Sequence, residues 1–375
     1  MRESSAELIR LNPDHGTGTP KVEAFERDGN HVIEGVIRGD RDAFIPIMNG
    51  VPVFLQGDMR PDLTGFCKKH GLALPPGGAN PHADGQAATT VTFSDKWRRF
   101  KNYGLEDDHK EFLFGWYCKK LGVETVDELK SFYRDKTTTL ELGPGSGFNS
   151  RFMAENVSGQ HYAVDISEAA FTTFENTRDL ENCHVVQSDL MHTPFDDNTF
   201  DFIIADGVLH HTPSTRAAVE ALYKKVRPGG QFFFYIYNKM GPARYFSDQY
   251  IREQFMKLSP EACYEACEAL TDLGRELSRL NAKIILKKPI DVLGIPAGEH
   301  DVQRLVYYNW FKCFWNEAFD YETNNMVNYD WYHPHHAWQH SREEVEGWLS
   351  ALGVKSFKFT DSNPNGISVL LTKPE

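Results

Sequence analysis

The chain has 375 residues, of which 41% are hydrophobic, and a formal net charge of −13 at pH 7. This length and composition suffice to bury a full core and are typical of one large domain with additions, or of two domains. The acidic balance disfavours a nucleic-acid-binding surface, which needs clustered Lys and Arg to displace counterions.

The cysteine content and the absence of long apolar runs indicate the compartment. Six scattered cysteines are too few for a disulfide scaffold in a chain of this size. The first residues lack the apolar core of a signal peptide, and no apolar run approaches the roughly 18 residues of a membrane span. We therefore expect a cytoplasmic protein that does not cross a membrane.

The first part of the chain, residues 1–60, predicts a small antiparallel β module. Its segment "HVIEGVIRGDRDAFIPIMNGVPVFLQGD" is rich in Val and Ile and contains two glycine-bearing turns. The next part, 61–135, contains a Pro, Gly and Ala-rich stretch at 74–90, which we expect to be a linker or mobile loop. From 93 onward, apolar residues recur three or four positions apart, which predicts helices.

Strand and helix patterns alternate over 136–239. Five apolar strand patterns occur, "TTLELG", "HYAVDIS", "HVVQSDL", "FDFIIAD" and "QFFFYIY", and helical patterns at 151–156 and 169–180 follow the first two. Alternation of this kind buries parallel strands between two helical layers. About a hundred aromatic, mostly helical-looking residues, 240–340, interrupt this order before a final helix and two strands in 341–375. The sequence predicts an α/β fold.

Three glycines follow the first of these strands, in "LELGPGSGFNS". In a doubly wound sheet this turn lies at the topological switch point, where ligands bind across the strand ends. Gly143, Gly145 and Gly147 lack Cβ atoms, so the backbone can turn sharply and approach a ligand closely. A tight turn that packs helix on strand, with no ligand, is the alternative that this motif alone leaves open.

Carboxylates at the ends of successive strands favour an adenosine-bearing ligand. Asp165 ends the second strand, where a carboxylate can accept both hydrogen bonds from a ribose diol. Asp189 follows the third strand and could accept from an adenine amino group, with Leu190 against the ring. Glu141 suits an ammonium group and would repel a pyrophosphate, and Phe148 replaces the third glycine of a dinucleotide fingerprint. Each carboxylate alone could equally be a solvated strand-end residue.

These segments together resemble class I S-adenosylmethionine-dependent methyltransferases of the ubiquinone-methyltransferase-like, type 11 group. The resemblance rests on "LELGPGSGFNSRF", "YAVDIS", "QSDLMHTPFDDNTFDFIIADGVLHHT" and "KKVRPGGQFFFYIYNK", and resumes from 341 to the end. It implies a Rossmann-like, seven-stranded, mostly parallel sheet with an antiparallel last strand, and S-adenosylmethionine as cofactor with S-adenosylhomocysteine as product. The cofactor positions that it implies are Glu141, Gly143, Gly145, Gly147, Asp165, Ile166, Asp189, Leu190, Asp206 and Gly207.

Candidate catalytic residues lie just past the fourth strand. The resemblance places Asp206 and Gly207 toward the sulfonium and the substrate. Methyl transfer is an in-line displacement that needs alignment above all, and a base only when the nucleophile must lose a proton. His210 and His211 could supply that base, because histidine titrates near neutral pH. Either histidine could instead cap or pack the following helix.

Two additions precede the core. Residues 1–60 resemble the zinc-ribbon-like module of Trm112 proteins, but no cysteine occurs before Cys67, so four-thiolate zinc binding is excluded. We expect the module to pack against the core or to form part of a homodimer contact. In "FSDKWRRFKNYG", Phe93, Trp97, Phe100 and Tyr103 share one predicted helical face. That face either is buried as core or forms a lid over the cofactor.

The insertion at 240–340 would lie above the same strand ends, where acceptor-binding elements belong. Its aromatic residues could form an apolar pocket, a cation cage or simply core. The candidate substrate residues are Trp97, Tyr103, Tyr307, Trp331 and His336. The histidines of "DWYHPHHAWQH" have loose spacing, so we expect no bound metal. Cys263 and Cys267, one helical turn apart, would need a third thiol to bind a soft acceptor such as trivalent arsenic.

The sequence therefore predicts a methyltransferase with a β module (1–60), a linker and helical lid (61–135), a core (136–239 and 341–375) and a substrate-recognition insertion (240–340). The expected acceptor is a small molecule of a biosynthetic or secondary-metabolite pathway, methylated on oxygen, nitrogen or carbon. An enzyme acting on RNA or protein and a non-catalytic cofactor-binding subunit are the alternatives. A nicotinamide oxidoreductase or epimerase is disfavoured by Phe148.

Overall fold

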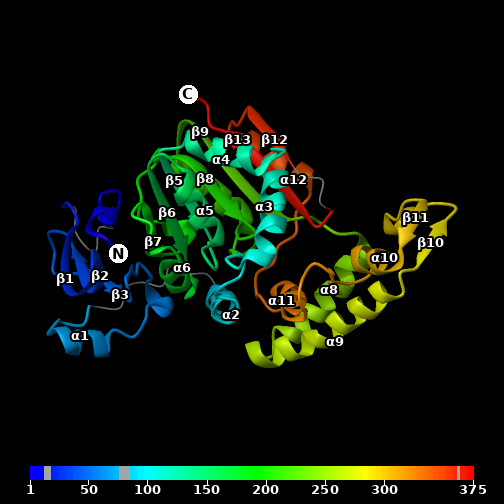
Figure 1. Cartoon of the computed structure of the whole chain (residues 1–375), viewed down its shortest axis with the longest axis horizontal. Helices are drawn as coiled ribbons and strands as arrows, with labels where there is room; N and C mark the ends of the chain where they lie inside the picture. Colours follow the sequence, from blue (N-terminus) through cyan, green and yellow to red (C-terminus); the bar gives the residue numbers. More distant parts are fainter. Residues whose placement is uncertain (12–17, 76–84, 361–363) are drawn as a thin grey trace.

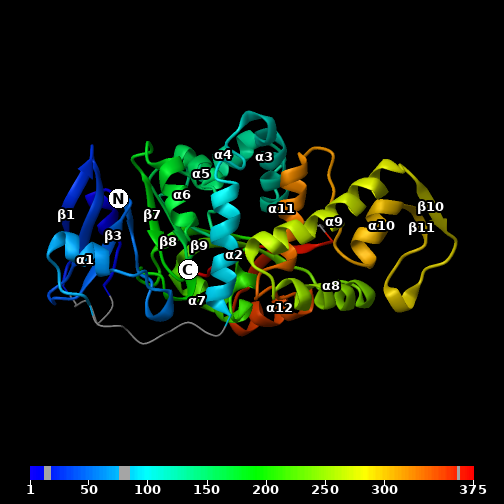
Figure 2. The same ribbon diagram turned by 90° about the horizontal axis from the view of Figure 1, so that it is seen from below.

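The computed structural model describes residues 1–11, 18–75, 85–360 and 364–375. A central sheet with its helices lies between a small N-terminal β module at one end and a helical insertion at the other (Figure 1). The view turned by 90° keeps the same three-part order (Figure 2). The central part is therefore flanked by the two additions.

The central sheet has seven strands in the order β12-β13-β9-β8-β5-β6-β7. Its strands are β5 (Thr138–Leu142), β6 (Gln160–Asp165), β7 (Cys183–Gln187), β8 (Phe200–Asp206), β9 (Val226–Tyr237), β12 (Ser356–Phe359) and β13 (Gly366–Thr372). β13 runs antiparallel to both of its neighbours, and the pairs formed by β5 to β9 are parallel. The predicted α/β fold, with a mostly parallel seven-stranded sheet and an antiparallel last strand, is confirmed.

Both faces of this sheet are buried. Along β8 and β9, successive side chains point to opposite faces: Ile203, Phe232 and Phe234 belong to one apolar cluster. Ile204 and Phe233 belong to a second cluster on the other face. The covering helices are α3 (Asp107–Leu121), α4 (Val126–Arg134), α5 (Phe148–Asn156), α6 (Ala169–Thr177), α7 (Thr215–Lys225) and α12 (Arg342–Ala351). Burial on both faces explains why these strands read as continuous apolar runs.

The N-terminal module is the expected small antiparallel β unit. It contains β1 (Lys21–Asp28), β2 (His31–Arg38), β3 (Phe44–Met48) and β4 (Val51–Pro52), paired in that order, followed by α1 (Thr64–His70). Just after β4, Val53 forms a parallel bridge with Gln187 of β7, and the Phe54 amide donates to the Gln187 carbonyl at 2.8 Å. The module therefore covers the edge strand β7. Its likeness to Trm112 proteins and a role in dimer formation stay predictions.

The insertion is helical with a β-hairpin at its tip. It comprises α8 (Pro242–Phe255), α9 (Pro260–Arg279), β10 (Lys283–Leu286), β11 (Gly298–Asp301), α10 (Val302–Asn309) and α11 (Tyr321–Tyr332). The short 3-10 helices of the described chain are η1 (Glu3–Ala6), η2 (Gly57–Met59), η3 (Leu190–His192), η4 (Leu209–His211) and η5 (Asp291–Leu293).

In Figure 2 helix α2 (Gln86–Arg99) lies between the sheet and the insertion.

Two expectations about the segment before the core need correction. Residues 86–90 belong to helix α2 and not to a linker, while 76–84 lie outside the described residues. Helix α2 ends at Arg99, so Phe100 and Tyr103 lie beyond it rather than on its apolar face. The chain turns away there, and Gly104 has a positive φ of 77° that favours glycine.

Candidate active site

A cavity of about 1160 Å³ lies at the carboxyl ends of β5, β6 and β8. Residues from α2, α3 and the insertion complete its walls. The predicted cofactor positions that line it are Glu141, Gly143, Asp165, Ile166, Asp189, Leu190, Asp206 and Gly207. Parallel strands place their carboxyl ends at one edge, which explains how residues far apart in the sequence meet here.

The turn after β5 requires glycine for a steric reason. Gly143, Gly145 and Gly147 have φ values of 68°, 62° and 81°, in the left-handed region. A Cβ on Gly145 would lie 2.5 Å from the ring of Trp97, so the indole packs directly on this turn. Gly145 and Gly147 are not among the described residues that line the cavity, and Gly147 packs instead near Thr173. Their contribution is to shape the turn.

Glu141 is a buried carboxylate at the end of β5. Its Oε1 accepts a hydrogen bond from Asn149 Nδ2 at 2.8 Å, and its Oε2 accepts one from the Ser150 hydroxyl. Burial raises the pKa of Glu141 to about 7, because these two bonds only partly offset the loss of water. A cationic ligand group beside it would favour the ionised form.

Asp165 ends β6, and Asp189 lies two residues past the end of β7. Asp165 Oδ1 accepts from the amide and hydroxyl of Ser167 at 2.8 and 2.7 Å, and burial raises the pKa of Asp165. Asp189 Oδ1 accepts from the Met191 amide at 2.8 Å, and its Oδ2 lies 3.1 Å from His192 Nδ1. Both aspartates line the cavity. Their predicted contacts with ribose and adenine stay predictions.

The carboxylate of Asp206 is paired with a lysine that the sequence reasoning missed. Lys120 Nζ on α3 lies 2.6 and 2.8 Å from the two carboxylate oxygens of Asp206. The same ammonium lies 3.9 Å from the centre of the Trp116 ring and 4.3 Å from that of Tyr235. The spacing of Trp116 and Lys120, four residues apart in a helical pattern, could have placed both on one face.

The two histidines have different surroundings. His210 is fully buried, its ring is stacked 3.7 Å from that of Tyr237, and it is not among the described residues that line the cavity. His211 does line the cavity, and its Nδ1 lies 2.6 Å from the carbonyl oxygen of His336. Because a carbonyl can only accept, Nδ1 carries the proton and Nε2 keeps its lone pair. Burial lowers the pKa of His211 to about 4, so the ring is neutral at pH 7.

The candidate substrate residues are only partly brought together. Trp97, Tyr103, Tyr307 and Trp331 line the cavity. His336 is not among the described lining residues, and its ring is stacked on that of Trp338 instead, because the chain turns between α11 and α12 there. The expectation that His336 faces the substrate therefore needs correction.

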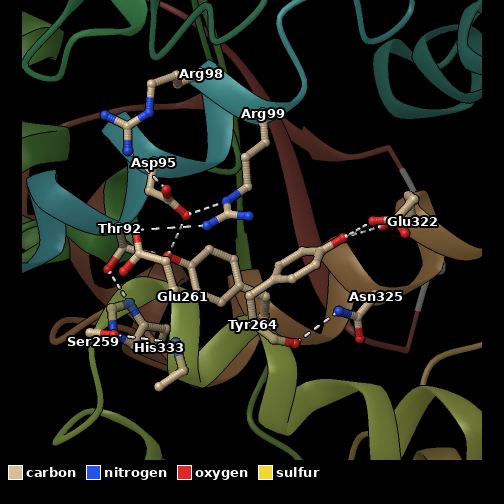
Figure 3. A network of polar contacts seen from close by, with 12 residues as sticks. Thr92, Asp95, Arg98, Arg99, Ser259, Glu261, Tyr264, Glu322, Asn325 and His333 are labelled. Carbon is tan, nitrogen blue, oxygen red and sulfur yellow. Dashed lines mark hydrogen bonds and ion pairs between the residues drawn. The ribbon is translucent and has the colours of Figure 1, made fainter.

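Helix α2 is tied to the insertion by polar contacts (Figure 3). Within α2, Asp95 accepts from Arg99 at 2.8 Å, and Arg99 Nη2 lies 3.8 Å from Glu261 Oε1 of α9. Thr92 Oγ1 lies 2.7 Å from His333 Nδ1, just after α11. The Arg99 guanidinium lies 5.0 Å from the centre of the Tyr264 ring of α9. These contacts hold α2, which carries Trp97, over the glycine turn.

Two further observations concern metals and membranes. Within 1–11, 18–75, 85–360 and 364–375, no three His, Cys, Asp or Glu side chains are grouped so that they could hold a metal ion. In the same ranges no helix is both long and apolar enough to cross a bilayer.

The comparisons with known proteins concern the central part of the chain. Residues 140–234 match the model of a family described as "Methyltransferase domain". Phosphoethanolamine N-methyltransferase 2 of Caenorhabditis elegans is 26% identical over 159 residues, 40% of this chain and 36% of the relative. The arginine-hydroxylase NDUFAF5 of Homo sapiens is 26% identical over 157 residues, 41% of this chain and 44% of the relative. The chain thus spans less than half the length of these two curated relatives.

A solved structure gives a more distant likeness. The N-methyltransferase NodS from Bradyrhizobium japonicum, in complex with S-adenosylhomocysteine, is 12% identical with a TM-score of 0.38. This match covers 77% of the present chain and 100% of the other. A likeness this distant carries no information about the acceptor.

Proposed function

Starting from the class I S-adenosylmethionine-dependent methyltransferase domain that this chain contains, we propose that the protein transfers a methyl group to a small-molecule acceptor. One observation supports this most strongly. A single cavity joins the strand-end carboxylates Glu141, Asp165 and Asp189 to an aromatic wall, part of which the insertion supplies. Cofactor and acceptor would therefore share one cavity.

The residues present fit the cofactor. S-adenosylmethionine supplies an activated methyl group on a sulfonium centre. Glu141 would hold its amino-acid ammonium, Asp165 its ribose diol, and Asp189 with Leu190 its adenine. Three carboxylates suit the cationic and hydroxyl groups of this ligand better than they suit a pyrophosphate.

The chain's own residues would act by alignment and by exclusion of water. Trp97 packs over the glycine turn and Tyr103 lines the same cavity, so both would shield the reacting groups from bulk solvent. Where the acceptor must lose a proton, His211 is the candidate base, because it lines the cavity and its Nε2 keeps a lone pair without a partner, although that nitrogen is buried in the unliganded structure. Asp206, held by Lys120, would help to position the acceptor at the end of β8.

The setting of the cavity favours a small acceptor over RNA or protein. Helices α2 and α3 and the insertion wall it, and the whole chain carries a net charge of −13. All six cysteines are free and buried, which supports a reducing, cytoplasmic compartment. We propose that such an enzyme acts in a biosynthetic pathway.

Calorimetric titration with S-adenosylhomocysteine tests this proposal through its pH dependence. The pKa of Glu141 is about 7 in the free protein, and the ligand ammonium favours the ionised form. Below pH 7 binding must first remove the proton, so we expect an affinity about tenfold lower at pH 6 than at pH 8. Glu141→Gln should bind more weakly and lose this pH dependence.

NAD serves as the matched ligand control in the same titration. The proposal predicts no binding of NAD under conditions in which S-adenosylhomocysteine binds. Binding of NAD without any binding of S-adenosylhomocysteine would contradict a methyltransferase and would favour an oxidoreductase.

A further inference from the structure

The acceptor side of the cavity has an excess of positive charge, although the whole chain is acidic. Setting aside Glu141, Asp165 and Asp189, which the proposed function assigns to the cofactor, the charged lining residues are Lys96, Lys119, Lys120, Arg304, Lys312, Glu111, Asp206 and Asp330. Five cations thus face three carboxylates, an excess of two. Two of the cations are neutralised at close range, Lys120 by Asp206 at 2.6 Å and Lys96 by Asp330 at 2.7 Å.

Lys312 differs from these paired lysines. It is 6% exposed, and no described residue accepts a hydrogen bond from its ammonium. Its Nζ lies 4.5 Å from the centre of the Trp331 ring, which forms part of the same wall. Lys312 Nζ is not among the described buried polar atoms without a partner, so this ammonium is accessible from the cavity and free to donate to a ligand there.

The backbone of Lys312 is held rigidly, so the position of this ammonium is specified by the fold. Its amide donates to Asp248 Oδ1 at 2.9 Å, and its carbonyl oxygen lies 2.9 Å from the Tyr332 hydroxyl. Asp248 is itself fully buried in an ion pair with Arg244. The side chain therefore extends into the cavity wall from an anchored point.

We propose that the acceptor carries an anionic group, a carboxylate or a phosphate, which the Lys312 ammonium binds while the aromatic wall holds the rest of the molecule. The wall includes Trp116, Tyr235, Tyr307 and Trp331. This inference rests on the proposed function, because the cavity beside the cofactor is taken as the acceptor site. The inference goes beyond the proposed function by specifying the charge and the chemical class of the acceptor.

The protonation of Lys312 gives the proposal a pH dependence. Burial lowers the pKa of Lys312 to about 7; Asp330 and Asp248 raise it, whereas Arg244 and Lys96 lower it further. An anion bound at Nζ favours the protonated form. Affinity for an anion is therefore greatest below pH 7 and falls as the pH rises above it.

The test uses the full chain saturated with S-adenosylhomocysteine and titrated calorimetrically with benzoate, phenyl phosphate and benzamide at pH 6.5. We expect the acids to bind more tightly than the neutral amide, and Lys312→Met to weaken acid binding at least about tenfold. The control Lys283→Met removes an exposed lysine of the insertion that is not among the described lining residues, and it should leave the binding of both acids unaffected. Lys312→Arg should retain acid binding and keep it up to pH 8.5, where the unmodified protein loses it.

The relative affinities of the two acids show whether the site prefers a carboxylate or a phosphate. Acids that bind no better than benzamide, or a Lys312→Met protein that binds them like the unmodified chain, would overturn the inference. These results are separate from the proposed function, since S-adenosylhomocysteine binding is measured first and on its own. Failure of that first titration contradicts the proposed function instead.

Discussion

Replacing Asp248 by alanine is expected to lower the free energy of unfolding by about 3–5 kcal/mol. Asp248 is fully buried and accepts from the Arg244 guanidinium. It also accepts from the Trp331 indole at 2.9 Å, the Tyr332 hydroxyl at 2.8 Å and the Lys312 amide at 2.9 Å. The substitution leaves a buried guanidinium without its counter-charge and several donors without an acceptor. Urea denaturation, with hydrogen exchange over 242–332, measures the effect.

A matched control is available within the same insertion. Asp272 pairs with Arg275 at 2.8 Å, but its side chain is 51% exposed. Asp272→Ala should therefore cost no more than about 1 kcal/mol. If the two substitutions lowered the free energy of unfolding equally, the buried network around Asp248 would not be what stabilises the insertion.

Asp165→Asn is expected to weaken S-adenosylhomocysteine binding about 100-fold or more at pH 8. A ribose diol donating to a carboxylate makes two charge-assisted hydrogen bonds, and each contributes about tenfold in affinity. The amide keeps an oxygen that can accept from Ser167, so the local turn should survive. Calorimetry measures the affinity, and circular dichroism checks the fold.

Asp197→Asn is the control for this substitution. Asp197 is a 55% exposed carboxylate that pairs with Lys225 and is not among the described lining residues of the cavity. The Asp197→Asn protein should bind S-adenosylhomocysteine with the same affinity as the unmodified protein. An affinity unchanged in Asp165→Asn would mean that the cofactor does not lie across the end of β6.

The sequence predicted the parts of the site that the sheet topology brings together. Strand-end residues such as Glu141, Asp165 and Asp189 could be assigned because parallel strands place their carboxyl ends at one edge. Periodicity and turn signals are local properties, and they were strong over 136–239. The α/β alternation and the strand-end positions of these carboxylates followed from them, whereas the seven-stranded sheet with its antiparallel last strand was implied by the family resemblance.

The missed residues come from elements whose placement depends on tertiary packing. Lys96, Lys120 and Lys312 lie on α2, on α3 and after α10, and no local pattern fixes where those segments meet the sheet. Tyr103 reaches the cavity from beyond the end of α2, so its position follows from the turn at Gly104 rather than from helical spacing. The β10–β11 hairpin was also missed, since its short strands lie inside a mostly helical insertion.

The most direct test of the central claim is incubation with deuteromethyl-labelled S-adenosylmethionine and a fractionated extract of the host, followed by mass spectrometry. The account predicts that label appears in a small molecule, in an amount that falls sharply with Asp165→Asn. Label in RNA or protein, or no label from a protein that binds S-adenosylhomocysteine tightly, would contradict a small-molecule methyltransferase.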